Sequence, residues 1–329
     1  MAKRIAINGF GRIGRITFRI LESMPDVEVV AINDLTDVAT LAHLLKYDSA
    51  QGIFDADVEA KENGIAVNGR LVKAYSEKDP KSLPWKSDNI DIVLECTGLF
   101  RNAEKAGWHI EAGAKKVVIS APGSGDGVST IVLGVNDENI DPSQNIYSNA
   151  SCTTNCLSPL AKVIVDNFGF VYGSMVTIHA YTGDQRLQDA PHKDLRRARA
   201  AATNIVPTTT GAAKAAAIVI PELKGKMSAM AYRVPTITGS LVEVNCVLEK
   251  ETTTEAFNEA VKKASEGRLK GILKYNTDPI VSSDIIGSPY SSIFDAELTE
   301  VNGKYLKAVT WYDNEAGYSH RLAELAVRI

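Results

Sequence analysis

The sequence predicts an α/β protein in which a doubly wound parallel sheet is followed by a mixed α+β domain with a large, mainly antiparallel sheet. A strand, a glycine-rich turn and a helix open the chain, and short apolar runs then alternate with helical or turn-rich stretches, as in parallel sheets. After about residue 150, strands alternate apolar and polar residues, as in antiparallel sheets. We place the two domains at 1–151 and 152–314, and expect an amphipathic helix over 315–329 to pack back on the first.

Composition is ordinary for a globular enzyme, with 45% hydrophobic and 23% charged residues. The net charge of -4 argues against a general binder of nucleic-acid backbones. The start MAKRIAINGF lacks the apolar core of a secretion signal, and no run approaches the 18 apolar residues of a membrane span. Four cysteines are too few for a disulfide framework, so we expect a reducing cytoplasm. The lack of long apolar runs leads us to expect no membrane association.

The first strand, KRIAIN, leads into a turn containing Gly9, Gly11 and Gly14 and then into a helical segment. A second strand, VEVVAIN, ends at Asp34, twenty residues past Gly14. This order and spacing are the fingerprint of a Rossmann-type dinucleotide site, where glycines admit a pyrophosphate and the acid accepts from ribose hydroxyls. Because Asp34 would repel a 2′-phosphate, the sequence favours NAD over NADP.

Further buried strands are predicted at 90–96, 115–120 and 129–135. Two of them end in turn residues, the pair at 97–98 and the SAPG run at 120–123. Carboxyl ends of parallel strands bind ligands in such sheets, although both runs are equally compatible with plain turns.

In the second half we expect helices at about 155–167 and over 252–267. Strands are predicted at 173–182, 240–250 and 304–313.

A polar stretch over 182–216 is too long for an idle connection. Its basic residues form either a solvated face or, together with the following TTTG, a site for a small anion. These residues are Lys193, Arg196, Arg197 and Arg199.

The stretch NASCTTNCLSP places Cys152 and Cys156 near a helix start. The spacing is a poor match to zinc sites, and we expect no metal. Ser151 can cap the helix, so that Cys152 lies at its N-terminus, where the helix dipole favours a thiolate, while Cys156 falls one turn deeper as a buried hydrophobe. His179 is either the base that takes the proton of Cys152 or a histidine whose hydrogen bonds are simply satisfied within a strand. A nucleophilic cysteine combined with a nicotinamide site indicates aldehyde oxidation through a hemithioacetal and a thioester.

Several runs in unbroken order resemble the glyceraldehyde-3-phosphate dehydrogenase family: INGFGRIGR, SNASCTTNCLSPLAK, PHKDLRRARAA, PTTTGAAKA, MAYRVPT and WYDNEAGYS. The resemblance implies oxidation of glyceraldehyde 3-phosphate to 1,3-bisphosphoglycerate with NAD and inorganic phosphate, in a homotetramer.

The resemblance also implies residue roles. Cys152 attacks the aldehyde, and His179 activates the thiol. Lys78 stands where many relatives have arginine, a departure expected to weaken an adenine-side contact without abolishing it. The implied cofactor contacts are Gly9, Gly11, Arg12, Ile13, Gly14, Asp34, Lys78, Ser120, Asn314 and Tyr318. The implied contacts of the attacking phosphate are Ser151, Thr153, Thr210 and Gly211, and those of the substrate's own phosphate are Thr182, Arg197 and Arg233.

Two alternatives stay open. Erythrose-4-phosphate dehydrogenase is a sister family that releases its thioester to water, and its members usually lack the TTTG motif. A second role in surface adhesion or RNA binding is compatible with an intact catalytic site, but nucleic acid is not expected as the main ligand.

Overall fold

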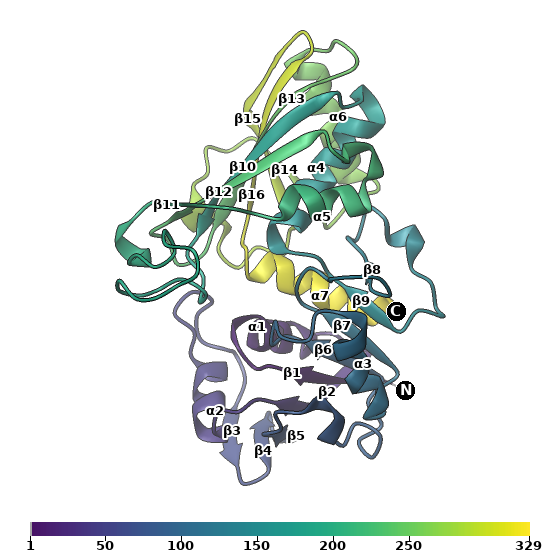
Figure 1. The fold of residues 1–329 in the computed structure, drawn as a ribbon, viewed down its shortest axis with the longest axis vertical. Helices are drawn as coiled ribbons and strands as arrows, with labels where there is room; N and C mark the ends of the chain where they lie inside the picture. Colours follow the sequence, from purple (N-terminus) through teal and green to yellow (C-terminus); the bar gives the residue numbers. More distant parts are fainter. Residues whose placement is uncertain (1) are drawn as a thin grey trace. The chain divides into compact units, whose positions relative to one another are not determined.

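The computed structural model describes residues 2–329, which form two compact units (Figure 1). Unit 1 comprises residues 2–131, 138–150 and 319–329, and unit 2 comprises Val132–Asp137 and Ser151–Tyr318. The last helix, α7 (Ala316–Arg328), therefore begins in unit 2 and continues into unit 1.

Unit 1 is built on a sheet of nine strands in the order β3-β4-β5-β2-β1-β6-β7-β9-β8. All neighbours from β5 to β8 are parallel, and only the β3-β4-β5 edge is antiparallel. The helices of this unit are α1 (Arg12–Leu21), α2 (Val38–Lys46) and α3 (Ala103–Glu111). The strands are β1 (Lys3–Asn8), β2 (Val27–Asn33), β3 (Val58–Lys61), β4 (Gly64–Val67), β5 (Arg70–Tyr75), β6 (Ile92–Glu95), β7 (Lys116–Ile119), β8 (Ser129–Thr130) and β9 (Ile146–Ser148).

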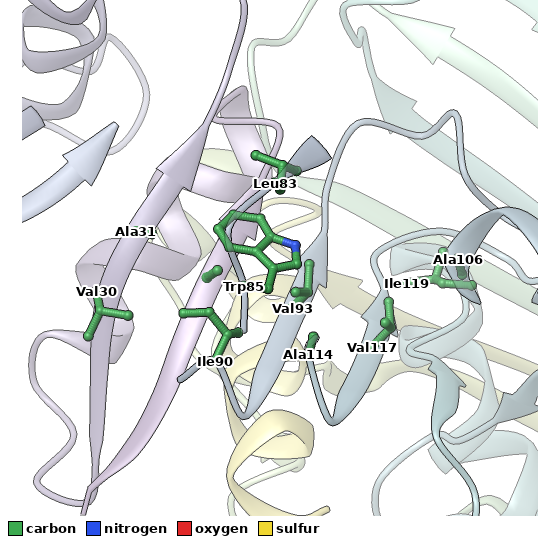
Figure 2. Packing of buried hydrophobic residues seen from close by; sticks show 11 residues of the cluster. Val30, Ala31, Leu83, Trp85, Ile90, Val93, Ala106, Ala114, Val117 and Ile119 are labelled. Carbon is green, nitrogen blue, oxygen red and sulfur yellow. The ribbon is translucent and has the colours of Figure 1, made fainter. Parts of the chain in front are cut away.

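Apolar side chains of the central strands form the core of unit 1. Trp85 is fully buried, and Figure 2 shows its indole beside Leu83, Ile90 and Val93. The indole nitrogen donates to His109 Nδ1 at 3.0 Å, so the one polar atom of this large side chain is satisfied. This packing fixes β6, whose carboxyl end faces the glycine turn after β1.

The strand predicted over 129–135 is wrong beyond its first two residues. After β8 the chain turns, because Asn136 accepts a hydrogen bond from the Val132 backbone at 2.8 Å through its side chain and donates its own N–H to the Val132 carbonyl. Gly134 has a φ of +81°, which no strand residue adopts. The apolar side chains of the run are nevertheless buried, which explains the misleading pattern.

Unit 2 is built on a sheet of seven strands in the order β11-β12-β10-β13-β16-β15-β14. Its pairs are antiparallel except for β10 with β12 and β14 with β15. Helices α4, α5 and α6 group on one side of this sheet (Figure 1). The strands are β10 (Tyr172–Ala180), β11 (Val206–Thr208), β12 (Met227–Val234), β13 (Ser240–Val247), β14 (Leu273–Asn276), β15 (Ser292–Asn302) and β16 (Tyr305–Tyr312), and the helices are α4 (Cys152–Phe168), α5 (Ala212–Val219) and α6 (Thr254–Glu266).

Candidate functional site

Each of the three glycines after β1 is required for a different physical reason. Gly9 has a φ of +90°, and a Cβ there would lie 2.7 Å from the Thr97 nitrogen. A Cβ on Gly14 would lie 2.3 Å from the Gly9 carbonyl oxygen, so this glycine lets α1 pack tightly on the loop. A Cβ on Gly11 would meet nothing within 4 Å. Gly11 precedes α1 and offers no side-chain cap, so no side chain at this position blocks the approach of an anion to the helix start.

Asp34 directly follows β2, beside this loop. One carboxylate oxygen accepts from the Phe10 backbone at 2.8 Å, and the other accepts from the Thr36 backbone at 3.0 Å. Asp34 therefore both ties the glycine loop to β2 and caps the following turn. A cavity of about 560 Å³ opens at this point, and it is lined by Asn8, Gly9, Gly11, Asn33, Asp34, Leu35, Glu77, Lys78, Cys96, Thr97, Leu99 and Phe100.

Buried polar side chains hold the walls of this cavity. Glu95, at the end of β6, accepts from the Asn8 amide at 2.6 Å and from the Thr97 backbone at 2.8 Å. His109 Nδ1 accepts from Trp85, so Nε2 carries the proton and donates to Glu95 at 3.0 Å. The network joins the carboxyl ends of β1 and β6, where a dinucleotide is held in folds of this type.

Not every predicted cofactor contact lines this cavity. Arg12 forms an ion pair with Asp48, and Ile13 follows it in the first turn of α1. Ser120 follows β7, where its backbone donates to the Glu95 carbonyl at 2.9 Å and its hydroxyl bonds the Cys96 thiol. Burial raises the pKa of Cys96 to about 12, so this thiol stays protonated.

Cys152 is the first residue of α4, as expected for a helix capped by Ser151, and α4 begins three residues before the approximate range of 155–167. Ser151 caps the helix, with its hydroxyl accepting from the Thr154 backbone at 3.1 Å. The thiol is partly accessible, whereas Cys156 one turn later is fully buried.

Cys152 and His179 lie side by side, with Sγ and Nε2 3.4 Å apart. The other ring nitrogen, Nδ1, lies 2.6 Å from the Ala180 carbonyl. Because a carbonyl can only accept, Nδ1 carries the proton and Nε2 is left as an acceptor for the thiol. The residues of this pair come from the N-terminus of α4 and the end of β10.

Burial favours the neutral form of both side chains. Burial lowers the pKa of His179 to about 3, and the nearby Arg233 guanidinium adds to this effect. Burial also raises the pKa of the Cys152 thiol, although Arg233 opposes that shift. The helix N-terminus therefore does not by itself produce the thiolate that the sequence led us to expect.

Tyr312 packs against this pair and is itself held by two threonine hydroxyls. The ring of Tyr312 packs edge-on against His179, with centroids 5.9 Å apart. Its hydroxyl lies 2.9 Å from the Thr153 hydroxyl and 3.0 Å from that of Thr177. Thr153, predicted to contact phosphate, thus has a hydroxyl already engaged in the core. Nothing in the spacing of the sequence signals Thr177.

Three residues predicted to hold the substrate's phosphate converge on one carboxylate. Arg233 lies opposite His179 in the register of β10 and β12, and donates to the Thr182 hydroxyl. Arg197 donates to Asp184 at 2.6 Å, and Arg233 lies 3.8 Å from the same carboxylate. Hydrogen bonding and both arginines lower the pKa of Asp184 against the opposing effect of burial. Both guanidinium groups lie near the Asp184 carboxylate, and a bound anion with similarly placed oxygens could accept hydrogen bonds from the same N–H groups.

The residues predicted around the attacking phosphate fall into two local sets. Ser151 and Thr153 lie at the start of α4, whereas Thr210 and Gly211 lie at the start of α5. The Thr210 hydroxyl accepts from the Ala212 backbone at 3.2 Å. No hydrogen bond within residues 2–329 joins one set to the other.

Asn314 and Tyr318 lie at the junction of β16 and α7. Asn314 is 5% exposed, and its Oδ1 lies 2.9 Å from the Ser240 hydroxyl. Tyr318 is buried on the first turns of α7. Asp313 caps that helix by accepting from the backbones of Glu315 and Ala316.

All four cysteines are free thiols. Within residues 2–329, no group of three or more His, Cys, Asp or Glu side chains has an arrangement suited to a metal ion. None of the helices described over the same range combines the length and apolar character of a membrane span.

Two family models match the chain. The NAD binding domain of glyceraldehyde 3-phosphate dehydrogenase matches residues 3–103, and the C-terminal domain of that family matches residues 151–314. The glyceraldehyde-3-phosphate dehydrogenase of Geobacillus stearothermophilus is 57% identical over 331 residues, which cover 100% of this chain and 98% of the relative. That of Mycolicibacterium smegmatis is 56% identical over 337 residues, covering 100% and 99% respectively.

Proposed function

Because the chain belongs to the glyceraldehyde-3-phosphate dehydrogenase family, we propose that it oxidises D-glyceraldehyde 3-phosphate to 1,3-bisphosphoglycerate with NAD+ and inorganic phosphate. The observation that carries this proposal is the 3.4 Å approach of Cys152 Sγ to an unprotonated His179 Nε2. A thiol beside a fixed acceptor nitrogen is suited to nucleophilic attack on an aldehyde carbon.

The neutral pair defines how the first step proceeds. As sulfur bonds the aldehyde carbon, the thiol proton passes to His179 Nε2, so no free thiolate has to be stored. The imidazolium then returns the proton to the developing oxygen of the hemithioacetal. The backbone N–H of Cys152, at the open start of α4, is one donor available to that oxygen. His179 later takes the hydroxyl proton again as the carbon is oxidised to a thioester on Cys152.

We assign NAD+ to the cavity beside the glycine loop of unit 1. Gly11 leaves room for a pyrophosphate at the start of α1, and Asp34 offers carboxylate oxygens to ribose hydroxyls. When bound, NAD+ supplies the acceptor for the hydride of the substrate. Glu77 and Asp34 give the cavity two carboxylates, which disfavour the extra phosphate of NADP.

The two arginines near Asp184 are assigned to the substrate's own phosphate. Arg197 and Arg233 can present parallel N–H donors to phosphate oxygens, and Thr182 adds a hydroxyl. The attacking phosphate is assigned to Ser151, Thr153, Thr210 and Gly211. Phosphate attack on the thioester carbon expels the Cys152 sulfur and forms the acyl phosphate, and the sulfur then regains its proton.

The test follows NADH absorbance with glyceraldehyde 3-phosphate and NAD+, with and without inorganic phosphate. Sustained turnover that requires phosphate supports the proposal. Equal turnover without phosphate would identify a hydrolytic enzyme, such as erythrose-4-phosphate dehydrogenase, and would overturn the assignment of Thr210 and Gly211. Erythrose 4-phosphate serves as the comparison substrate, and Cys152→Ser serves as the inactive control.

A homotetramer and a cytoplasmic location belong to the same proposal. Exposed apolar side chains in the 182–216 stretch support an interface between copies, because Leu187, Leu195 and Ile205 are each at least 68% exposed. Light scattering of the purified chain checks the assembly. Four copies of the 35.5 kDa chain are expected, and a monomeric mass would contradict the proposal.

A further inference from the structure

We propose that Ser240 is a positioning residue that fixes the side-chain amide of Asn314 and, through the Ala180 peptide, the imidazole of His179. The inference rests on the proposed function, to which we add that Asn314, one of the cofactor contacts implied by the family resemblance, binds the carboxamide of NAD. It adds to that function one hydroxyl that orients both the cofactor contact and the base.

The contacts of Ser240 leave little freedom for its hydroxyl. Ser240 begins β13 and is 2% exposed. The Ala180 backbone N–H donates to its Oγ at 3.0 Å, so Oγ acts there as an acceptor. Its single hydrogen is then available for Asn314, whose Oδ1 lies 2.9 Å away.

This pairing sets which end of the Asn314 amide faces inward. If the amide were reversed, two N–H donors would point at Oγ, and the buried Ser240 hydrogen would have no acceptor. The neighbouring Thr238 hydroxyl donates to the Asp313 carboxylate at 2.7 Å, so it does not compete strongly for Asn314 Oδ1. With Oδ1 held inward, Nδ2 forms no hydrogen bond with any residue in the described range 2–329. Nδ2 is therefore the donor that Asn314 offers to a carboxamide oxygen.

The same hydroxyl is linked to the base through one residue. Ala180 donates its backbone N–H to the Ser240 hydroxyl, and it is the residue that directly follows His179. Its carbonyl accepts from His179 Nδ1 at 2.6 Å, and Nε2 faces Cys152 at 3.4 Å. A continuous path of contacts thus runs from the Cys152 thiol through His179 and Ala180 to Ser240, which passes it on to the Asn314 amide.

Removing the hydroxyl should affect two separate properties. In Ser240→Ala the Asn314 amide is free to reverse, and the Ala180 N–H loses its acceptor. We expect the dissociation constant of NAD+ to rise roughly fivefold to tenfold, as for the loss of one hydrogen bond. We also expect the rate of Cys152 alkylation against pH, measured without NAD+, to shift because His179 is less firmly held.

The experiment compares Ser240→Ala with Ser240→Thr, which keeps the hydroxyl, and with Ser292→Ala. Ser292 is a fully buried strand serine of the same unit whose hydroxyl bonds Thr310 at 2.6 Å. NAD+ binding is measured by titration calorimetry, and thiol alkylation by iodoacetamide. Both properties should change in Ser240→Ala, should be largely retained in Ser240→Thr, and should be unchanged in Ser292→Ala. Equal effects in Ser240→Ala and Ser292→Ala would overturn the inference, because general loosening of the unit would then explain both.

Asn314→Ala separates the two levels of the argument. If Asn314→Ala leaves NAD+ binding unchanged, the assigned role of Asn314 fails, and the inference built on it fails with it. If Asn314→Ala weakens binding but Ser240→Ala does not, only the positioning role of Ser240 is wrong.

Discussion

The position of one proton on His179 decides what Cys152 can do. Nδ1 is committed to the Ala180 carbonyl, so Nε2 is free to take the thiol proton. Burial favours the neutral thiol and the neutral imidazole, and in the proposed mechanism the thiol therefore loses its proton only as it attacks the aldehyde. A protonated thiol is also less exposed to oxidation than a stored thiolate.

Replacing this base should slow the chemistry of the thiol itself. In His179→Asn the Cys152 sulfur loses the acceptor at 3.4 Å, while burial continues to oppose its ionisation. Alkylation by iodoacetamide at neutral pH is expected to slow roughly tenfold, and its midpoint is expected to move to higher pH. Cys156→Ser is the control, because that thiol is fully buried and should not contribute. An unaltered profile in His179→Asn would mean that the two side chains are not functionally paired.

The charge of Asp34 should set the choice between NAD and NADP. Asp34→Asn removes the negative charge but keeps one oxygen for the hydrogen bonds to Phe10 or Thr36. The preference for NAD, taken as the ratio of the two kcat/KM values, is expected to fall about tenfold. Glu77→Gln removes a second charge from the same cavity and is the matched control. A preference that changes equally in both variants, or in neither, would argue against a specific ribose contact.

The glycine loop and α1 allow folding and cofactor binding to be separated. Gly14→Ala places a Cβ 2.3 Å from the Gly9 carbonyl, which must push α1 away from the loop, whereas Gly11→Ala places a Cβ in open space. Gly14→Ala is therefore expected to lower the thermal unfolding temperature and NAD+ binding together. Gly11→Ala should keep its unfolding temperature but lose NAD+ affinity, because the methyl group occupies the approach of the pyrophosphate.

Calorimetric binding and circular-dichroism melting of both variants check this prediction. If Gly11→Ala binds NAD+ as well as the parent chain does, the pyrophosphate does not approach this loop.

Local elements were largely predictable from the sequence, because their signals are short-range. The first strand, the glycine turn and α1 follow from periodicity and spacing, as does the cap of Ser151 on α4. The strand expected over 129–135 was wrong beyond Thr130 because the rest of the run is buried without forming a strand, and burial alone gives the same apolar pattern. Strand β12, which carries Arg233, was not identified, since its alternation is weak.

Contacts between distant segments could not be predicted in the same way. The approach of His179 to Cys152 depends on how β10 lies against α4. The sequence alone therefore left two roles open for His179, a base for Cys152 or a histidine on a strand. Asp184 and Ser240 carry no pattern of their own, because each is defined by partners many residues away. Resemblance to a family supplied roles for residues but not these supporting contacts.

The buried base should also make the folded chain sensitive to acid. The pKa of His179 is about 3 in the folded state, against an ordinary value of 6.5. Between these values the unfolded chain binds a proton that the folded chain does not, so stability is complete above pH 6.5 and falls as the pH decreases toward 3. At pH 5 the loss from this one group is about 2 kcal/mol.

His179→Asn cannot take up that proton, and its stability should therefore fall less than that of the parent chain between pH 7 and pH 5. Urea unfolding followed by circular dichroism at both pH values measures the difference. His43→Asn, which alters an exposed histidine on α2, is the matched control and should follow the parent chain. If His179→Asn and the parent chain lose equal stability, His179 titrates in the folded protein much as it does in the unfolded one. The imidazole would then take up a proton in this range and leave a neutral thiol beside an imidazolium, which cannot accept the thiol proton, so the first catalytic step should slow over the same pH interval.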